Sequence, residues 1–249
     1  MNFSDALELA LLDRDAPVVT DYEFYLLGMS LLRAGEWKGD KLIRKPLGWD
    51  HTRARNALRR LLERAAIAPD ADFRSGVWRV VQSTRAGTAE EVACIADPFC
   101  YVSHLSAMER YGLTNRSPEA LHLTSPARPI WNRLRDETVA ADRASDNASL
   151  HPPLLRIGFK DKIRRRPVVV HETRHPADPV PVRGEQTRIT SIGRTFVDML
   201  SEPHLCGGIG HALEVWESRA EDWIEQIVDE ADEVASKIVK VRAGYLLTE

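Results

Sequence analysis

The stretch DHTRARNALRRLLERAA, from Asp50 to Ala66, decides how the fold is interpreted. With a helical turn of about 100° per residue, its apolar residues fall on one side and its polar residues on the other. The apolar side carries Ala54, Ala57, Leu58, Leu61, Leu62 and Ala65. The polar side carries Thr52, Arg55, Asn56, Arg59 and Arg60. Because Asp50 is a good N-cap residue, we expect an amphipathic helix that begins there and exposes a basic face.

Two shorter helices are predicted before this one. Residues Ser4–Arg14 place leucine and alanine at helical spacing, with Ser4 as the expected N-cap. A second helix starts after Thr20, because Glu23 three residues later completes a capping box, and it ends at Gly35. The connection EWKGDKLIRKPLGWD that follows is basic and broken by glycine, with a short strand or turn expected around Leu42 and Ile43.

Two short strands are predicted after the basic helix. The segments ADF and VWRVV flank Arg74-Ser75-Gly76, which has turn composition. A helix, a second helix, a basic helix and a hairpin in this order are typical of a winged helix-turn-helix domain. We therefore predict an α+β fold, with a winged helix-turn-helix in residues 1–85 and a mixed α/β domain in residues 86–249.

This order predicts a DNA-reading surface. Arginine can bond guanine through two hydrogen bonds and asparagine can do the same with adenine, while lysine and arginine around the groove contact phosphate. The candidate DNA-binding residues are Lys38, Lys41, Arg44, Lys45, His51, Thr52, Arg53, Arg55, Asn56, Arg59, Arg60, Arg74 and Ser75. Two other interpretations stay open: a helical domain whose basic face contacts an acidic protein partner, and a basic face that is only solvated.

Charge is distributed unevenly along the chain. The 249 residues have a formal net charge of -3, yet residues 33–64 carry ten lysines and arginines against four acids. From residue 201 to the end there are eleven acids against four bases. A local concentration of positive charge is the expected footprint of a phosphate partner, which the whole-chain average hides.

Composition excludes several classes of protein. No apolar run reaches the 18 residues that a membrane helix needs, and the first 15 residues carry acids where a secretory signal has lysine or arginine. The three cysteines, Cys94, Cys100 and Cys206, lack metal-ligand spacing and are odd in number. We expect a cytoplasmic protein with no membrane partner, no metal and no cofactor.

The second half mixes helical and strand-like segments. Strands are predicted at residues 100–102, at ALHLT, and at LLRIGF, RPVVVHETR, PVPVRG and TRITS. Helices are predicted at AEEVACIA, after Ser103, at residues 130–141 and through the final 50 residues. A polar segment at residues 144–149 is expected to be an exposed loop.

One motif in this half suggests an enzyme. The sequence His171-Glu172-Thr173-Arg174-His175 matches H-E-x-x-H, the zinc-peptidase signature, which requires a helix. Here it follows three valines and precedes Pro176, so we predict a strand, in which the two histidines would lie about 13 Å apart. A zinc peptidase, or another cryptic hydrolase such as a nuclease, is kept as the alternative function, and no catalytic residue is assigned.

Two further segments are ambiguous. Lys160, Lys162, Arg164, Arg165 and Arg166 form an auxiliary basic run, which would serve phosphate contact, partner contact or solubility. The glycines of Gly207-Gly208-Ile209-Gly210 are interpreted as a flexible helix start, because the lysine and hydroxyl residue of a phosphate-binding loop are missing.

Two stretches resemble a known family. They are DPFCYVSHLSAMERYGLT, residues 97–114, and RITSIGRTFVDMLSEPHLCGGIGHALE, residues 188–214. They are similar to the AbiEi family, the antitoxins of type IV toxin–antitoxin systems. The first matches a strand followed by a Ser-x-x-Ser-Ala helix that starts at Ser103. The second matches a Ser-x-x-Arg-Thr-x-x-Asp helix and a Pro-x-x-x-Gly-Gly turn, carried by Ser191, Arg194, Thr195, Asp198, Pro203, Gly207 and Gly208.

The resemblance implies a function for the whole chain. Members of the family are similar in having an N-terminal winged helix, binding inverted repeats in their own promoter, and repressing the operon. The implied partners are therefore double-stranded operator DNA and a nucleotidyltransferase-like toxin, the latter without a stable complex. The motif residues look structural, since Arg194 and Asp198 can pair at i and i+4. One departure is the longer connection between the second and third helices.

Overall fold

The computed structural model describes residues 1–144 and 152–248, and the loop expected at residues 144–149 lies almost wholly outside them. The chain divides into two compact units, one of residues 1–98 and 128–164, the other of residues 99–127 and 165–249. This differs from the predicted division at residue 85, because the chain passes three times between the units. The winged helix-turn-helix domain in residues 1–85 stays a prediction. The chain is a mixed helix-and-strand protein, as predicted.

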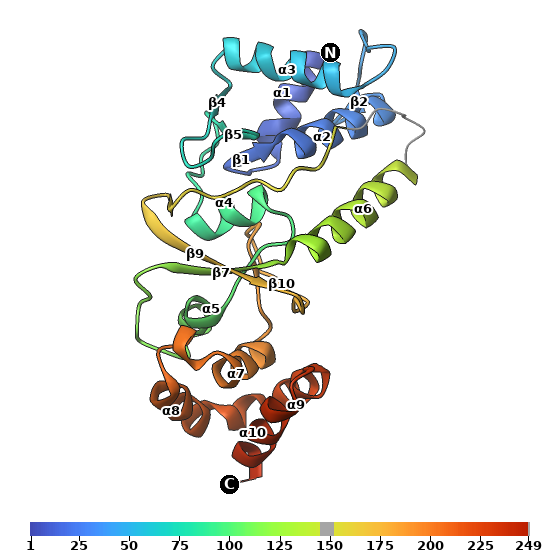
Figure 1. Cartoon of the computed structure of the whole chain (residues 1–249). Helices are drawn as coiled ribbons and strands as arrows, with labels where there is room; N and C mark the ends of the chain where they lie inside the picture. Colours follow the sequence, from blue (N-terminus) through green and yellow to red (C-terminus); the bar gives the residue numbers. More distant parts are fainter. Residues whose placement is uncertain (145–151, 249) are drawn as a thin grey trace. The chain divides into compact units, whose positions relative to one another are not determined.

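The first unit is built mainly from the N-terminal segment. Its elements are α1 (Phe3–Asp13), β1 (Val18–Thr20), α2 (Asp21–Ala34), β2 (Glu36–Trp37), β3 (Asp40–Lys41), α3 (His51–Glu63), β4 (Ile67–Pro69), β5 (Val77–Val80), α4 (Ala89–Ala96), α6 (Arg128–Ala144) and β8 (Lys162–Ile163). Helices α1, α2 and α3 pack together around a common apolar core. Strands β1, β5 and β4 form an antiparallel sheet in that order, and β2 pairs with β3 as a separate hairpin (Figure 1).

Local sequence explains where these helices begin and end. The Thr20 hydroxyl accepts the backbone N–H of Glu23 and the Glu23 carboxylate accepts that of Thr20, so the predicted capping box is present. Gly35 ends α2 at a φ of 69°, a conformation that glycine adopts without strain. The prediction of Ser4 as the first N-cap is wrong, since Asn2 holds that position and Ser4 lies within α1.

Two strand predictions in the first unit need correction. The first strand of the predicted hairpin is Ile67–Pro69, and residues 71–73 belong to the turn instead. Residues 154–159, predicted as a strand, run without strand pairing apart from a single bridge between Phe159 and Phe73. Their aromatic rings meet edge to face at 6.1 Å, so this segment packs along the turn by side-chain contact.

The second unit joins a sheet to a helical layer. Its elements are β6 (Tyr101–Val102), α5 (His104–Arg110), β7 (Leu121–Pro126), β9 (Arg166–Thr173), β10 (Val180–Pro181), β11 (Arg188–Ile189), α7 (Ile192–Ser201), α8 (Ile209–Arg219), α9 (Ile224–Glu233) and α10 (Lys237–Thr248), with short 3-10 turns at Pro203–Leu205 and Ala220–Trp223. The strands lie in the order β10-β11-β6-β7-β9, with β7 and β9 parallel. A second apolar core joins α5 and α7 to the three C-terminal helices.

Helices α7 and α9 approach closely at Gly193. A Cβ built on this glycine would lie 2.0 Å from the backbone oxygen of Gln226, so no larger side chain fits without moving a helix. None of the helices in the described ranges, 1–144 and 152–248, combines the length and apolar character needed to cross a membrane.

Candidate nucleic-acid interface

Helix α3 is amphipathic as its sequence predicts, although Leu62 and Ala65, which were assigned to its apolar side, are exposed. The Asp50 carboxylate accepts the backbone N–H of Arg53 at 2.8 Å, which fixes the helix start at the expected N-cap. Ala54, Leu58 and Leu61 are buried in the core of the first unit. The opposite face is therefore turned to solvent by the packing of the apolar one.

Trp49 holds the start of α3 in place. Its indole Nε1 donates to the backbone oxygen of Tyr25 at 2.9 Å, and its ring lies 5.1 Å from that of Phe3. The indole packs directly on α2 at Gly28, where a Cβ would lie 2.3 Å from the ring. Trp49 is buried, so the residue before the N-cap is anchored to both preceding helices. Sequence reasoning missed this role, although a tryptophan directly before an N-cap was the available signal.

Every predicted DNA-binding residue is exposed. On α3 these residues are His51, Thr52, Arg53, Arg55, Asn56, Arg59 and Arg60. Two of these basic side chains also form ion pairs: Arg53 lies 3.2 Å from Asp50 and Arg59 lies 3.9 Å from Glu63. Exposed pairs of this kind contribute little, about 0.3 to 0.5 kcal/mol each, and leave the side chains able to meet a phosphate.

The connection before α3 adds further basic side chains to the first unit. Lys38, Lys41, Arg44 and Lys45 are all exposed. Lys38 forms an ion pair with Asp13 and lies over the Trp37 ring, 5.3 Å from its centroid. The short strands β2 and β3 begin this connection, slightly earlier than the predicted turn at Leu42 and Ile43.

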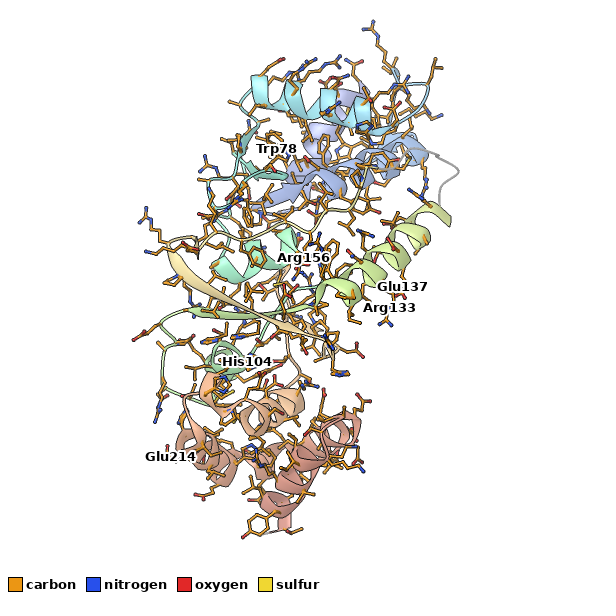
Figure 2. The ribbon with its side chains drawn as sticks, in the orientation of Figure 1. Trp78, His104, Arg133, Glu137, Arg156 and Glu214 are labelled. Atoms are coloured by element: carbon orange, nitrogen blue, oxygen red, sulfur yellow. The ribbon has the colours of Figure 1, made fainter. Side chains whose placement is uncertain are left out.

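The turn between β4 and β5 carries the last two candidates, Arg74 and Ser75, both exposed. The turn is supported by β1, since Thr20 pairs with Val77 across the sheet. Trp78, which lies on β5 and is labelled in Figure 2, donates its indole N–H to the Asp21 carboxylate at 2.6 Å. These contacts tie the hairpin to the start of α2.

The auxiliary basic run is not a set of free cations. Arg164 lies 2.7 Å from the buried carboxylate of Asp70 and 2.5 Å from that of Asp72. Lys160 donates to the backbone oxygen of Ala71, and Lys162 is exposed. In the second unit Arg165 is exposed, whereas Arg166 pairs with Glu109 at 3.3 Å. Arg164 therefore supports the β4–β5 turn, a role that none of the three interpretations of the basic run included.

The zinc-peptidase geometry is absent. His171 and Glu172 lie on strand β9, which ends at Thr173, and His175 lies beyond it. Across residues 1–144 and 152–248, no group of three or more histidine, cysteine, aspartate or glutamate side chains is arranged to hold a metal ion. The predicted strand is therefore confirmed for His171 and Glu172, which do not form the helical face that the H-E-x-x-H motif requires.

A polar cluster that the sequence did not predict surrounds His171 instead. His122 Nδ1 and His171 Nε2 share a hydrogen bond of 3.1 Å, because β7 and β9 lie side by side. His104 packs against His171, with ring centroids 4.8 Å apart. His104 also bonds the Ser103 hydroxyl at 2.8 Å and Glu202 at 3.1 Å. Ser103 is fully buried.

This histidine cluster predicts an acid sensitivity. Burial, followed by the neighbouring His104 and His122, lowers the pKa of His171 from 6.5 to about 4. The unfolded chain therefore binds more protons below pH 6.5, and stability falls as the pH drops from 6.5 towards 4. His171→Gln keeps a partner for His122 without titrating. We expect the wild type to lose on the order of 1 to 2 kcal/mol more than this variant between pH 7.5 and 5, measured by urea unfolding. Equal losses of stability in the wild type and the variant would show that His171 is not the source of the acid sensitivity.

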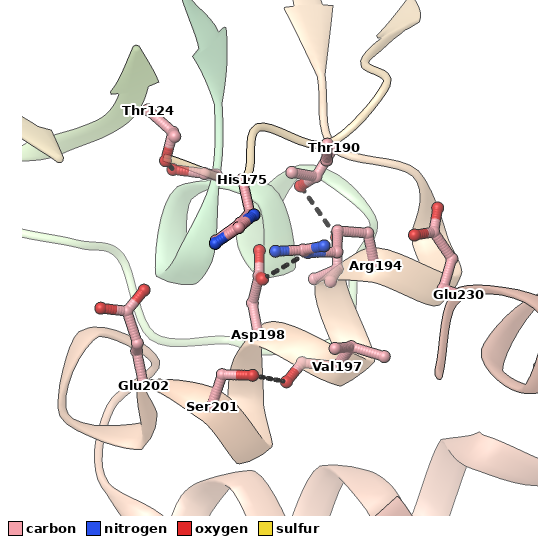
Figure 3. Close-up of polar contacts among 12 residues, drawn as sticks. Thr124, His175, Thr190, Arg194, Val197, Asp198, Ser201, Glu202 and Glu230 are labelled. Atoms are coloured by element: carbon pink, nitrogen blue, oxygen red, sulfur yellow. Dashed lines mark hydrogen bonds and ion pairs between the residues drawn. The ribbon is translucent and has the colours of Figure 1, made fainter. Parts of the chain in front are cut away.

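The residues of the family-like motifs serve the local structure of the second unit. The Arg194 guanidinium donates to Asp198 at 2.9 Å, the predicted i,i+4 pair, and Figure 3 shows both side chains on α7 facing each other. Burial raises the pKa of Asp198, an effect that Arg194 opposes. Gly207 and Gly208 have φ of 85° and 94° and lead into α8, as predicted for a helix start.

Comparison with models of known protein families gives no match, and comparison with curated proteins gives none either. The functional assignment therefore depends on the sequence and on the geometry described above.

Proposed function

We propose that this protein is a DNA-binding transcriptional regulator that reads duplex DNA with α3. The observation that carries the proposal is the exposed basic face of α3, fixed by a buried apolar face and an anchored N-terminus. The element order is α1-β1-α2-β2-β3-α3-β4-β5, with a sheet ordered β1-β5-β4. Apart from the β2–β3 hairpin inserted before α3, this order is typical of winged helix-turn-helix domains and supports the same conclusion. In such domains the third helix enters the major groove.

The proposed contacts divide into two kinds. Arg55 and Asn56 are exposed near the N-terminal end of α3, where recognition helices contact base edges. Lys41, Arg44 and Arg74 lie in the connection and the hairpin on either side of α3 in the sequence, and we assign them to phosphate. Base contacts supply sequence preference, whereas phosphate contacts supply affinity that falls with salt.

We further propose that the regulator represses its own operon and acts as the antitoxin of a type IV toxin–antitoxin system. The support is the resemblance of residues 97–114 and 188–214 to the AbiEi family. The regulated DNA is then an inverted repeat in its own promoter, and the toxin is a nucleotidyltransferase that forms no stable complex with this protein. We expect no enzymatic activity.

The biological part is tested by co-expression. The reading frame next to this gene is induced alone and together with the present protein, and growth is followed. We expect growth arrest only when the neighbour is expressed alone, and no co-purification of the two proteins. If growth arrest persists when both proteins are expressed, the antitoxin proposal is overturned. DNA binding is tested separately by the gel shifts below.

DNA reading predicts a specific loss for two substitutions. Arg55→Ala and Asn56→Ala should each weaken binding to the preferred duplex by about 1 to 3 kcal/mol, roughly 5- to 150-fold, because each removes a paired hydrogen bond to a base. The duplex is selected by the wild-type protein from a random pool, and affinities are measured by gel shift. Binding to unselected duplex should change far less.

A phosphate-contact variant provides the matched control. Lys41→Ala should weaken binding to every duplex and lower the slope of log affinity against log salt by about 1. If the wild type shows no preference for selected over random duplex, the repressor proposal fails. If Arg55→Ala and Lys41→Ala behave alike, α3 does not read bases.

A further inference from the structure

Two aliphatic side chains in the connection before α3 face solvent. Leu47 is 105% exposed and Ile43 is 80% exposed, more than any other large hydrophobic side chain among the described residues. Large apolar side chains are normally buried, so two of them held in water beside a basic helix suggest a function at the surface.

The exposure does not come from a loosely held segment. Leu42, next to Ile43, is buried, and its backbone N–H donates to Gly35 at 2.9 Å. The backbone N–H of Ile43 donates to Met1 at 3.0 Å, and Trp49 anchors the other end. Both ends of the segment are therefore fixed, and Ile43 and Leu47 are held outward between them.

The charge of this segment selects an anionic partner. Residues 41–49 contain Lys41, Arg44 and Lys45 and no acid. Arg44 and Lys45 are exposed and stand in the sequence between Ile43 and Leu47. A second copy of the same segment would bring like charges together, which disfavours self-association through this surface. A partner that combines negative charge with apolar surfaces fits better.

Duplex DNA has this combination in its minor groove. Proteins that bind there place lysine and arginine on the groove walls and insert isoleucine or leucine between base steps, which kinks the duplex. The segment leads directly into the N-cap of α3, and Figure 1 shows it projecting beside that helix. A groove next to the one that α3 occupies is therefore within its reach.

We propose that residues 42–48 enter the minor groove of the DNA that α3 reads, with Ile43 and Leu47 wedged against a base step. Arg44 and Lys45 contact the phosphates on either side. The inference rests on the proposed function, since it requires that the first unit binds duplex DNA. Pyrimidine–purine steps unstack most easily, so such a step is favoured where the wedge meets the DNA.

The test compares the wild type with the double variant Ile43→Ser/Leu47→Ser. Both side chains are exposed, so the variant should keep the thermal stability of the wild type. The probe is the duplex that the wild type selects from a random pool, with 2-aminopurine placed in turn at the steps flanking the α3 site. We expect the wild type to raise 2-aminopurine fluorescence at one step at least about twofold by unstacking it, and the double variant to leave it near the free-duplex value.

Two further measurements complete the test. The variant should bend the selected duplex less, measured by energy transfer between its ends, and bind it about tenfold more weakly. The salt dependence of its DNA binding should be unchanged, because the double variant removes no lysine or arginine. Val241→Ser, which alters a side chain that is 71% exposed in the second unit, is the matched control and should behave as the wild type.

Each outcome decides between the proposals. If the wild type does not bind DNA, the proposed function fails and the wedge fails with it. If the wild type binds selectively but the double variant bends and unstacks DNA equally, only the wedge is overturned. Loss of self-association by the variant, or loss of binding to anionic lipid vesicles, with DNA binding intact, would assign Ile43 and Leu47 to another partner and overturn the inference.

Discussion

Trp49→Ala is expected to lower the free energy of unfolding by about 3 to 5 kcal/mol, the usual cost of removing a large buried aromatic side chain. The indole fills the space between α1 and α2, contacts Phe3 and Phe24, and donates to the Tyr25 backbone oxygen. Its loss leaves a cavity beside the start of α3 and removes the hydrogen bond that ties this start to α2. Urea unfolding at pH 7.5 measures the effect.

The same substitution should affect DNA binding beyond its effect on stability. Trp49 precedes Asp50, so its removal frees both the start of α3 and the end of the basic connection. Measured at low temperature, where the variant is still folded, affinity for the selected duplex should fall more than affinity for random duplex. Trp49→Phe, which keeps most of the ring packing, is the control and should recover most of both losses. An unchanged ratio of the two affinities would show that Trp49 serves stability alone.

The sequence predicted α3 well because its signals are local. Asp50 as N-cap and the spacing of Ala54, Leu58 and Leu61 lie within a single helix, and the structure confirms both. The capping box of Thr20 and Glu23 and the pair of Arg194 and Asp198 are likewise local. Interactions that span three or four residues can be inferred from spacing alone.

Features that depend on distant residues were missed. Strand β1 has only three residues, Val18–Thr20, too few to show a period, and it forms by pairing with β5 far along the chain. The cluster of His122 and His171 arises because β7 and β9 lie parallel, which a motif search over His171–His175 does not reveal. The outward direction of Ile43 and Leu47 also escaped prediction, because alternation in so short a segment does not distinguish buried from exposed.

Arg164 shows most clearly how a distant contact changes the meaning of a residue. In the sequence it belongs to a basic run and suggests phosphate contact. In the structure its guanidinium bonds both Asp70 and Asp72, 94 and 92 residues away, and the Asp70 side chain is only 1% exposed. Asp70 also accepts the backbone N–H of Asp72 at 3.0 Å, which shapes the turn that was predicted as a strand.

Arg164→Ala is therefore expected to destabilise the protein by about 3 kcal/mol, because it leaves the buried Asp70 carboxylate without its cation. Asp70→Ala removes the buried carboxylate itself. The double variant Asp70→Ala/Arg164→Ala should therefore lose less unfolding free energy than the sum of the losses of the two single variants. Urea unfolding of the four proteins gives the coupling energy directly. DNA binding by folded Arg164→Ala should keep the salt dependence of the wild type, since a guanidinium held by two carboxylates releases no counterion from DNA. A lower salt slope with unchanged stability would instead return Arg164 to the phosphate-binding residues and separate it from the turn.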